Sequence, residues 1–324
     1  MPNKYLNRKG IEIAKQKHKV RNWSEYNAAL KRRGSLDIWI TEEAIENWYN
    51  KDQQQYGSGK QEEYTDLAII TCHEMRKVFH QPLRQATGFI DSIFRLMKLP
   101  IRSPGFSALS KRLGKLHINC PTYRNTDRPS EEVAGIAIDS TGLKRFGRDE
   151  WHQEKHKISA KRSWRKIHIA VDESHSIQAA TLTDRFVSDD TVVEELAEQI
   201  TKEVDHITAD GAYDKNPVYD DLSKHFPDAD IVIPPDKDAI YNKGNHPLRN
   251  RNVMEVKCFG RMGWQRARDY GKRNYSELAI LRYKRILGNT MQSREFSRQK
   301  QEAMIACGVL NKMTNLGMPQ SYKT

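Results

Sequence analysis

The chain has 324 residues, 37% of them hydrophobic and 30% charged, and it carries a formal net charge of +12. This length allows a sizeable core in one or two domains, and apolar clusters that recur along the whole chain exclude a disordered protein. No run approaches the roughly 18 apolar residues of a membrane-spanning helix, so an integral membrane protein of that kind is excluded. The positive charge favours a polyanionic partner, nucleic acid first and an anionic membrane surface second.

Four cysteines lie far apart in the chain: Cys72, Cys120, Cys258 and Cys307. They form no CxxC pair and no Cys/His cluster with zinc spacing. We therefore expect reduced, buried thiols in a cytoplasmic protein. The basic N-terminus leads into no apolar core, so we expect no signal peptide.

Residues 1–63 are predicted to be a basic arm followed by a linker. The first 34 residues carry ten lysines and arginines against two acids, which fits phosphate contact and fits a solvated tail equally well. The stretch TEEAIENWY predicts a short helix with Thr41 as its N-cap. The polar, glycine-containing stretch at 50–63 indicates a loop or linker.

Helical periodicity over three segments predicts a small helical domain at 64–125. The segments are TDLAIITCHEMRKVF, QPLRQATGFIDSIFRLMKL and SPGFSALSKRLGKL. In the third segment, Ser103 is expected to cap a helix that has Pro104 at its first position. This segment ends in three basic residues, Lys111, Arg112 and Lys115. Three short helices with tight connections fit a DNA-binding helix-turn-helix, and they also fit a small helical bundle with a basic surface.

From about residue 133 the pattern changes to short apolar strands. VAGIAID, RKIHIAVD and IQAATLT predict three strands, the last two joined by the turn ESHS. A helix (DDTVVEELAEQITKEV), a strand ending at Asp210, a helix (KNPVYDDLSKHF) and a strand (DIVIPP) follow. A strand meander followed by strand–helix alternation predicts an α/β domain with a mixed sheet at 130–290. Residues 291–324 are predicted to be a helical tail.

Asp139 and Asp210 each stand at the predicted carboxyl end of an apolar strand, where ligands and catalytic groups gather in open α/β sheets. Together with a glutamate from a packed helix they would offer the hard oxygen ligands that suit Mg²⁺ or Mn²⁺. Two such ions about 3.5–4 Å apart can activate a water or a 3′-hydroxyl and stabilise the leaving oxygen of a phosphodiester. Asp also ends strands as a turn former. We interpret Asp172 in that way, and we do not take Glu255 as the third acid.

The stretch DYGKRNYSELAILRYK at 269–284 is rich in basic residues and has Glu277 in its middle. Read as a helix, it places four side chains on or near one face: Tyr270, Arg273, Glu277 and Lys284. Three apolar residues share that face: Ile280, Leu281 and Leu287. We therefore expect Glu277 to point toward apolar surroundings. A surface stripe of ion pairs, worth about 0.2–0.5 kcal/mol per pair, leaves the tyrosine and the apolar neighbours unexplained.

The spacing of these four residues resembles the Tyr-Arg-Glu-Lys signature of bacterial insertion-sequence DDE transposases at every position. Other stretches resemble the same superfamily, and most of all its number-five insertion-sequence family: NWSEYNAALKRRGSLDIWI, HQPLRQATGFIDSIFRLMKL, IAIDSTGLKRFG, WRKIHIAVD and ITADGAYD. The resemblance extends from about Asn22 to Gly288. The spacing of 67 residues from Asp210 to Glu277 leaves no room for the large β-rich insertion domain of some relatives.

The resemblance implies a ribonuclease H-like mixed-sheet catalytic core with three metal-binding acids, Asp139, Asp210 and Glu277. It implies two Mg²⁺ ions, for which Mn²⁺ can substitute. By the same analogy Arg273 and Lys284 contact the phosphate near the scissile bond, and Tyr270 helps to order it. The helical domain would recognise terminal inverted repeats. The partners implied are double-stranded DNA, as element ends and target, and further copies of the chain in a homo-oligomeric DNA complex, with no membrane partner.

Between Thr141 and His168 the chain carries nine lysines and arginines against three acids. GRDEWHQEKHKISAKRSW, followed by Arg165 and Lys166, is predicted to hold DNA beside the active site, with tryptophans available for stacking. A solvated sheet edge with two half-buried tryptophans fits equally well. Three histidines in this region, His152, His156 and His168, lack the spacing of a zinc motif.

The leading hypothesis is a bacterial, cytoplasmic DNA transposase that cuts donor DNA at element ends and joins the 3′ ends to a target by hydrolysis and transesterification. The first alternative is a non-catalytic DNA-binding remnant or repressor that recognises the element ends, against which the intact acids argue. The second is a structure-specific nuclease, which would cut branched DNA without any dependence on terminal repeats.

Overall fold

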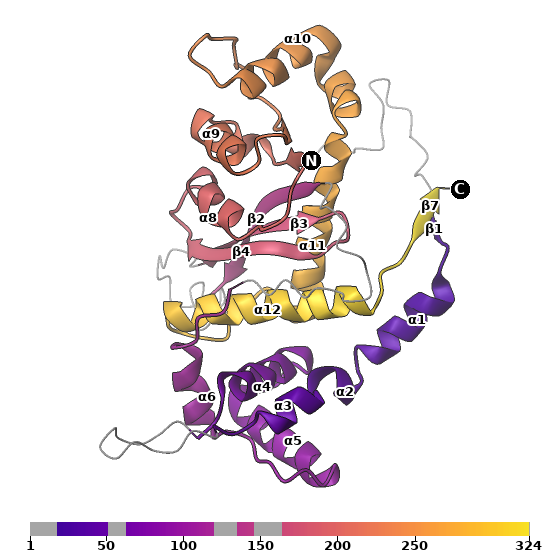
Figure 1. Ribbon diagram of the computed structural model, residues 1–324, viewed down its shortest axis with the longest axis vertical. Coiled ribbons are helices and arrows are strands. Elements are labelled where there is room, and N and C mark those ends of the chain that lie inside the picture. The colour runs from indigo at the N-terminus through magenta and orange to yellow at the C-terminus, as the bar shows by residue number, and fades with distance from the viewer. Residues whose placement is uncertain (1–17, 51–62, 120–134, 146–163, 324) are drawn as a thin grey trace, which may run out of the picture.

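The computed structural model describes residues 18–50, 63–119, 135–145 and 164–323 (Figure 1). Three predictions fall wholly or mostly outside these ranges. They are the first half of the basic arm, the linker, and the stretch before Trp164 that is predicted to hold DNA. Within the described residues, no helix combines the length and the apolar character needed to cross a membrane.

A five-stranded mixed sheet lies at the centre of the molecule (Figure 1). Its strands are β2 (Ile136–Lys144), β3 (Trp164–Asp172), β4 (Ile177–Asp184), β5 (His206–Thr208) and β6 (Asp230–Val232). They lie in the order β4-β3-β2-β5-β6. Strands β2, β3 and β4 form an antiparallel meander, whereas β5 and β6 continue the sheet in parallel from β2. This arrangement confirms the predicted α/β class with a mixed sheet.

Strand β2 is longer than its apolar run predicts. The predicted strand ended at Asp139, but β2 continues to Lys144 because it pairs with β3 over its whole length. Its parallel partner β5 pairs only with Ile136 and Ala137. Asp139 therefore lies within a strand, yet just beyond the point where the parallel half of the sheet ends.

One face of the sheet is covered by short helices. They are η1 (Asp189–Val192), α8 (Val193–Glu198) and α9 (Asn216–His225). Ile136 and Ile138 of β2 pack into this core, so Asp139 faces the opposite side. The helix predicted to extend to residue 204 ends at Glu198, although Ile200 is buried in the same core. The prediction of a helix beyond Glu198 was therefore wrong, because Ile200 is buried without being part of a helix.

Two helices from the C-terminal part of the chain, α11 (Asn274–Arg282) and α12 (Phe296–Leu316), cover the other face. After β6 follow α10 (Pro247–Ala267), η3 (Tyr270–Arg273), α11, η4 (Tyr283–Leu287) and α12. Figure 1 shows α12 running between the sheet and a group of N-terminal helices. One apolar core includes Ile169 of β3, Leu310 of α12 and Met75 of an N-terminal helix. The helical part and the sheet therefore share a core along α12.

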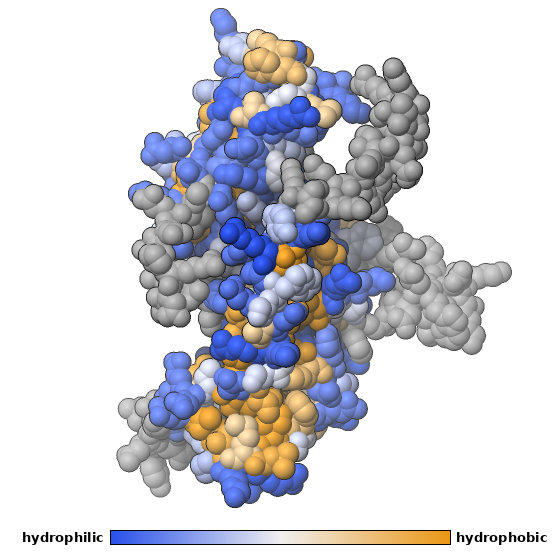
Figure 2. All heavy atoms as spheres, turned by 90° about the vertical axis from the view of Figure 1, so that its right-hand side faces the viewer, coloured by the Kyte–Doolittle hydropathy of each residue, from blue (hydrophilic) through white to orange (hydrophobic). Residues whose placement is uncertain are grey.

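The N-terminal part consists of helices. Its helices are α1 (Trp23–Arg32), α2 (Leu36–Trp39), α3 (Glu42–Glu46), α4 (Asp66–Val78), α5 (Leu83–Leu96) and α6 (Phe106–Leu113). Thr41 caps α3 as predicted, because its hydroxyl accepts the N–H of Ala44 at 3.2 Å. Figure 2 shows a broad apolar surface at the end of the molecule formed by this part.

The start of α6 differs from the prediction. Ser103 was expected to cap the helix and Pro104 to begin it, but α6 begins at Phe106 with Gly105 as its N-cap residue. The hydroxyl of Ser103 donates to the carbonyl of Pro104, and its N–H donates to Asp91 of α5 at 2.7 Å. The contact with α5 holds Ser103 away from the helix terminus that it was predicted to cap.

Polar contacts fasten α12 to its neighbours. Lys77 and Lys312 form ion pairs of 2.6 Å with Glu302 and Glu74, and each pair joins α4 to α12. Beyond α12 the chain forms β7 (Ser321–Lys323), which pairs antiparallel with β1 (His18–Val20) near the N-terminus. The stretch predicted as a helical tail therefore contains a central packing helix and a short strand.

Candidate active site

Asp139 and Asp210 are brought side by side by the parallel register of β2 and β5. The register pairs Ala137 with Thr208, and two further residues along both chains reach Asp139 and Asp210. Neighbouring strands lie about 4.8 Å apart, and residues an even number of positions apart face the same side. The two carboxylates therefore gather at the carboxyl edge of the parallel half of the sheet, facing the side covered by α11.

The turn after β5 fixes Asp210. Its carboxylate accepts the N–H of Ala212 at 2.9 Å, so Asp210 caps the short helix η2 (Gly211–Tyr213). An aspartate in this role is held by a backbone donor and leaves its second oxygen for another partner.

Helix α11 brings Glu277 to the same place. Arg273, at the start of α11, donates from Nη1 to Oδ2 of Asp139 at 3.2 Å, and Nη2 of the same guanidinium donates to Glu277. Arg273 therefore bridges the first and the third predicted acids. Asp269 precedes η3 and has a left-handed backbone, with a φ of 47°. This conformation turns the chain sharply between α10 and η3.

The surroundings of Glu277 differ from the prediction. Its side chain is 51% exposed, and Leu281, predicted to lie on the same apolar face, is also exposed. The single helix predicted at 269–284 is in fact a 3₁₀ turn, the short helix α11 and a wide turn at η4. These changes of helical pitch rotate the side chains relative to those of a uniform helix. The side chain of Glu277 therefore points toward solvent and not into the core.

The charge of Asp139 reflects its neighbours. Burial raises the pKa of its carboxyl, and Asp210 and Glu277 raise it further, whereas the N–H of Ser140 and the charge of Arg273 act in the opposite direction. Three acids from distant parts of the chain thus lie within electrostatic reach of one another. Burial alone would lower the pKa of Arg273, but the surrounding Tyr270 and acids raise it, so its charge is firmly held.

Tyr270 and Lys284 lie beside these acids. Burial raises the pKa of the Tyr270 hydroxyl, Arg273 lowers it and Asp210 raises it. The Nζ of Lys284 donates to the hydroxyl of Thr141 at 2.5 Å. Thr141 is two residues from Asp139 and so faces the same side of β2. The structure therefore gathers all six residues of the predicted catalytic set at one edge of the sheet.

The predicted DNA-contacting residues on α6 differ in their surroundings. Lys111 and Lys115 are exposed. Arg112 donates to the carbonyl of Tyr64 at 2.9 Å and pairs with Asp66. An arginine engaged in this way holds the helical part together, and contact with phosphate stays a prediction for the whole group.

Arg165 and Lys166 on β3 also have partners within the protein. Arg165 is buried, donates to the side chain of Gln299 at 2.9 Å and pairs with Asp184. Lys166 donates to Asp189 at 2.6 Å. Arg165 therefore ties the sheet to α12, whereas Lys166 belongs to a polar cluster next to the acids.

The role of Asp189 could not be seen in the sequence, where this residue only begins the predicted helix DDTVVEELAEQITKEV. One oxygen of Asp189 accepts from Ser140 at 3.0 Å, and the other accepts from Lys166. The N–H of Ser140 in turn donates to the carboxylate of Asp139 at 2.8 Å. Asp189 thus holds Ser140, the residue after Asp139, on the face of β2 opposite to Asp139. The antiparallel pairing of β2 with β3, which sets Ser140 and Lys166 close together, was the available signal.

The two rejected acids have structural partners. Asp172, at the end of β3, accepts from Ser174 and Ser176 of the following turn and from Gln178 of β4. Glu255 binds Arg268, with Nε of the arginine at 2.8 Å. Both observations agree with the interpretation of these residues as structural.

The acids fit divalent cations by the chemistry of their oxygens. Among the described residues, one group of acids and histidine has ligand atoms all within 4.8 Å of one another, and it consists of Glu194, Glu198 and His225 on α8 and α9. Its two glutamates are exposed, and exposed acids commonly gather without an ion. The predicted acids are not part of such a close group, and Arg273 pairs with both Asp139 and Glu277. Their three carboxylates remain the donor set that Mg²⁺ and Mn²⁺ prefer.

These features define an α/β protein with a carboxylate centre at the edge of its parallel strands. A family model described as a transposase DDE domain matches residues 134–312, more than half of the chain, and a second model of the same description matches residues 31–148. The chain therefore belongs to the DDE transposase family. It is a DNA transposase, a phosphoryl-transfer enzyme of a kind that in general uses divalent metal ions.

A solved structure also shows a distant likeness. The cryo-EM structure of the piggyBac transposase synaptic complex with hairpin DNA is 13% identical over 91% of this chain and 76% of that chain, with a TM-score of 0.37. At this level the likeness adds no support, and the family assignment depends on the family models.

Proposed function

We propose that this transposase mobilises an insertion sequence of the number-five family. It binds the terminal inverted repeats of the element, cleaves the donor strands and joins the 3′ ends to target DNA. The spacing of Tyr270, Arg273, Glu277 and Lys284 supports this assignment within the DDE transposases. The strand order β4-β3-β2-β5-β6, with an antiparallel meander beside parallel strands, supports a ribonuclease H-like core.

Asp139, Asp210 and Glu277 are the proposed ligands of two Mg²⁺ ions, with Mn²⁺ as a substitute. Bound ions would activate the attacking water or 3′-hydroxyl and stabilise the leaving oxygen. The protein contributes the placement of the acids, two from neighbouring strands and one from a packed helix. Ser140 and Ala212 donate backbone N–H groups that orient the two aspartates.

The basic signature residues act on the phosphate. Arg273 lies against two of the acids, so a phosphate that approaches them meets its guanidinium, which can bind two oxygens at once. Lys284 is held near Asp139 by Thr141 and supplies a second positive charge. Tyr270 packs its ring on that of Trp264, with centroids 5.3 Å apart, and this contact fixes its hydroxyl beside the acids.

The helical part at 64–125 is the proposed reader of the element ends, with the exposed Lys111 and Lys115 as its phosphate contacts. Double-stranded DNA is then the partner at both steps, as element end and as target. Because two ends must be held together for transposition, the active form with DNA is a homo-oligomer. Such a reaction takes place in the bacterial cytoplasm.

The bridging of Asp139 and Glu277 by Arg273 is the observation that carries this proposal, because it joins residues of β2 and α11 that are far apart in the sequence. The experiment compares cleavage of duplexes that carry the element ends with cleavage of scrambled duplexes, using the wild type and Glu277→Gln. The wild type should cut only the first kind, and the variant should bind it without cutting. Equal cutting of scrambled or branched DNA would favour a structure-specific nuclease, and binding without wild-type cleavage would favour a remnant.

A further inference from the structure

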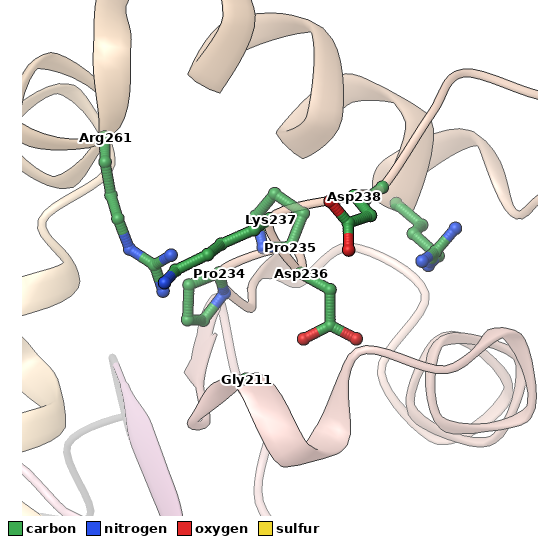
Figure 3. A pocket seen from close by; sticks show the side chains of 9 residues that line it. Gly211, Pro234, Pro235, Asp236, Lys237, Asp238 and Arg261 are labelled. Carbon is green, nitrogen blue, oxygen red and sulfur yellow. The ribbon is translucent and has the colours of Figure 1, made fainter.

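A cavity of about 590 Å³ opens beside Asp210 (Figure 3). It is lined by Gly211, by the loop at 234–239 that follows β6, and by Arg249 and Arg261 of α10. The volume is within the range of small-molecule sites, and the position is the carboxyl edge of the parallel strands, where ligands bind in open α/β sheets. Tyr270, Arg273, Glu277 and Lys284 do not line this cavity. The cavity therefore lies beside the acidic site and is separate from it.

The loop that forms one wall is firmly anchored. A Cβ on Gly211 would lie 3.3 Å from the carbonyl oxygen of Pro234, so glycine allows the loop to pack closely on the turn after Asp210. The buried carboxylate of Asp214 accepts from Nε and Nη2 of Arg249 at 3.0 and 2.9 Å. It also accepts the N–H of Asp236 at 3.4 Å. The cavity is thus built on the same turn that positions Asp210.

Two cations meet at the mouth of this cavity. In Figure 3 the side chains of Lys237 and Arg261 extend toward each other, whereas Asp236 and Asp238 leave the loop in other directions. Both basic side chains are exposed, and no acid among the described residues pairs with either. The charge of Arg249, in contrast, is neutralised by Asp214. Two like charges that converge repel each other, so their convergence favours an anion between them.

Arg261 also connects the cavity with the acids. It lines the same cavity as Gly211, the residue that directly follows Asp210. A DNA strand whose scissile phosphate lies at the acids would therefore pass the two cations with a neighbouring phosphate.

We propose that Lys237 and Arg261 form a phosphate-binding subsite for the DNA strand, adjacent to the scissile phosphate. This inference rests on the proposed function, because it takes the cut to occur at Asp139, Asp210 and Glu277. The ligand is a backbone phosphodiester of DNA. Arg261 can bind two of its oxygens with a planar guanidinium, and Lys237 adds a compact charge. The contact is with the backbone, so it holds the strand without selecting a base sequence.

The test compares Lys237→Ala/Arg261→Ala with the matched control Lys202→Ala/Lys224→Ala. Both double variants remove two positive charges, but Lys202 precedes β5 and Lys224 is near the end of α9, away from the cavity. Binding of a fluorescein-labelled DNA duplex of arbitrary sequence is measured by anisotropy over a series of KCl concentrations. The association constant K decreases as KCl is added, and the slope of log K against log [KCl] is negative. Its magnitude should be smaller by about 0.9 for each phosphate that the first variant no longer binds. The control should keep the wild-type slope.

Further measurements separate this inference from the proposed function. Thermal unfolding and Mn²⁺ binding of Lys237→Ala/Arg261→Ala should match the wild type, because neither side chain contacts the acids. The same salt series is measured for the charge reversal Lys237→Glu/Arg261→Glu. This variant should bind DNA more weakly than Lys237→Ala/Arg261→Ala. A wild-type slope in both variants would overturn the subsite while leaving the proposed cleavage intact. The predicted decrease of the slope in a protein that cuts no DNA would support the subsite and overturn the proposed function.

Discussion

Arg273 binds Asp139 across the edge of the central sheet, with Nη1 of the guanidinium 3.2 Å from Oδ2 of the carboxylate. The same guanidinium pairs with Glu277. A single positive charge thus offsets repulsion between two acids that are far apart in the sequence. We infer that Arg273 supplies the charge balance that divalent cations supply when they bind.

The first prediction concerns Arg273→Gln. Without divalent cations, this variant should lose about 1 kcal/mol of unfolding free energy, because the acids repel each other and the exposed part of the pair contributes little. Added Mg²⁺ should stabilise the variant more than the wild type, since ligand binding to the folded state adds to stability. Thermal unfolding in EDTA and in MgCl₂ measures both effects.

Arg268→Gln is the matched control, because Arg268 also bridges two acids, Glu255 and Asp230, away from the signature residues. Its loss of stability should be the same with and without Mg²⁺. If Arg273→Gln behaved like this control, Arg273 would have no special relation to a cation site.

The second prediction concerns Asp189, which holds Ser140 and Lys166 behind Asp139. Asp189→Ala leaves Lys166 half-buried without its acid and should cost about 1–3 kcal/mol of unfolding free energy. Strand cleavage should also fall, by about tenfold, because Ser140 orients Asp139. Urea unfolding and a cleavage assay on the same preparation measure the two effects.

The adjacent Asp190 provides the comparison. It pairs with Lys215, whose side chain is 50% exposed, so Asp190→Ala should cost less than about 1 kcal/mol and leave cleavage unchanged. Equal effects of the two substitutions would show that Asp189 has no positioning role.

The sheet and the location of Asp210 could be predicted from the sequence because they follow from local patterns. Apolar runs bounded by turn residues mark β3, β4, β5 and β6, and strand–helix alternation indicates the parallel half of the sheet. The full length of β2 could not be predicted in this way, because its second half is sustained by pairing with β3 and not by its own apolar residues.

The geometry of the site required tertiary information. Glu277 was predicted to point toward apolar surroundings because a uniform helix was assumed, but the left-handed Asp269 and the wide turn at η4 alter the helical phase. The partners of Arg165 lie on β4 and α12, and no local pattern indicates them. Likewise, Ser103 was assigned to a helix cap because its contact with Asp91 crosses between helices.

The third prediction concerns pH. Burial first, and the charge of Arg76 second, lower the pKa of His73 to about 4 from an ordinary value of 6.5. The unfolded chain then takes up a proton on this residue below about pH 6.5, while the folded chain does not until about pH 4. Stability is therefore complete above this window and falls as the pH drops through it, by up to about 3 kcal/mol.

His73→Gln should flatten this part of the pH profile, because glutamine keeps a donor for the carbonyl of Leu109 and cannot be protonated. His168, whose pKa burial also lowers to about 4, accounts for a residual slope. His117→Gln, at an exposed position, should keep the wild-type profile. Urea unfolding at a series of pH values tests this, and an unchanged slope in His73→Gln would refute the assignment.

The fourth prediction concerns Lys284, held near Asp139 by Thr141 at 2.5 Å. If it contacts the phosphate near the cut, Lys284→Ala should reduce strand cleavage by about 10–100-fold and lower the salt slope of DNA binding by about 0.9. Arg285→Ala removes the same charge from the exposed neighbouring position and should affect cleavage much less. Equal effects in both variants would show that Lys284 acts only through the net charge of the protein and does not contact the phosphate near the cut.

Calorimetric titration with Mn²⁺, paired with strand cleavage of the same samples, tests most directly whether Asp139, Asp210 and Glu277 form one cation site. Asp139→Asn, Asp210→Asn and Glu277→Gln should each weaken Mn²⁺ binding and reduce cleavage by about 10³-fold or more, because several kcal/mol of charge stabilisation are removed. Glu194→Gln, in the exposed acidic group on α8 and α9, should change neither quantity. Wild-type Mn²⁺ binding and cleavage in any of the first three variants would contradict the account.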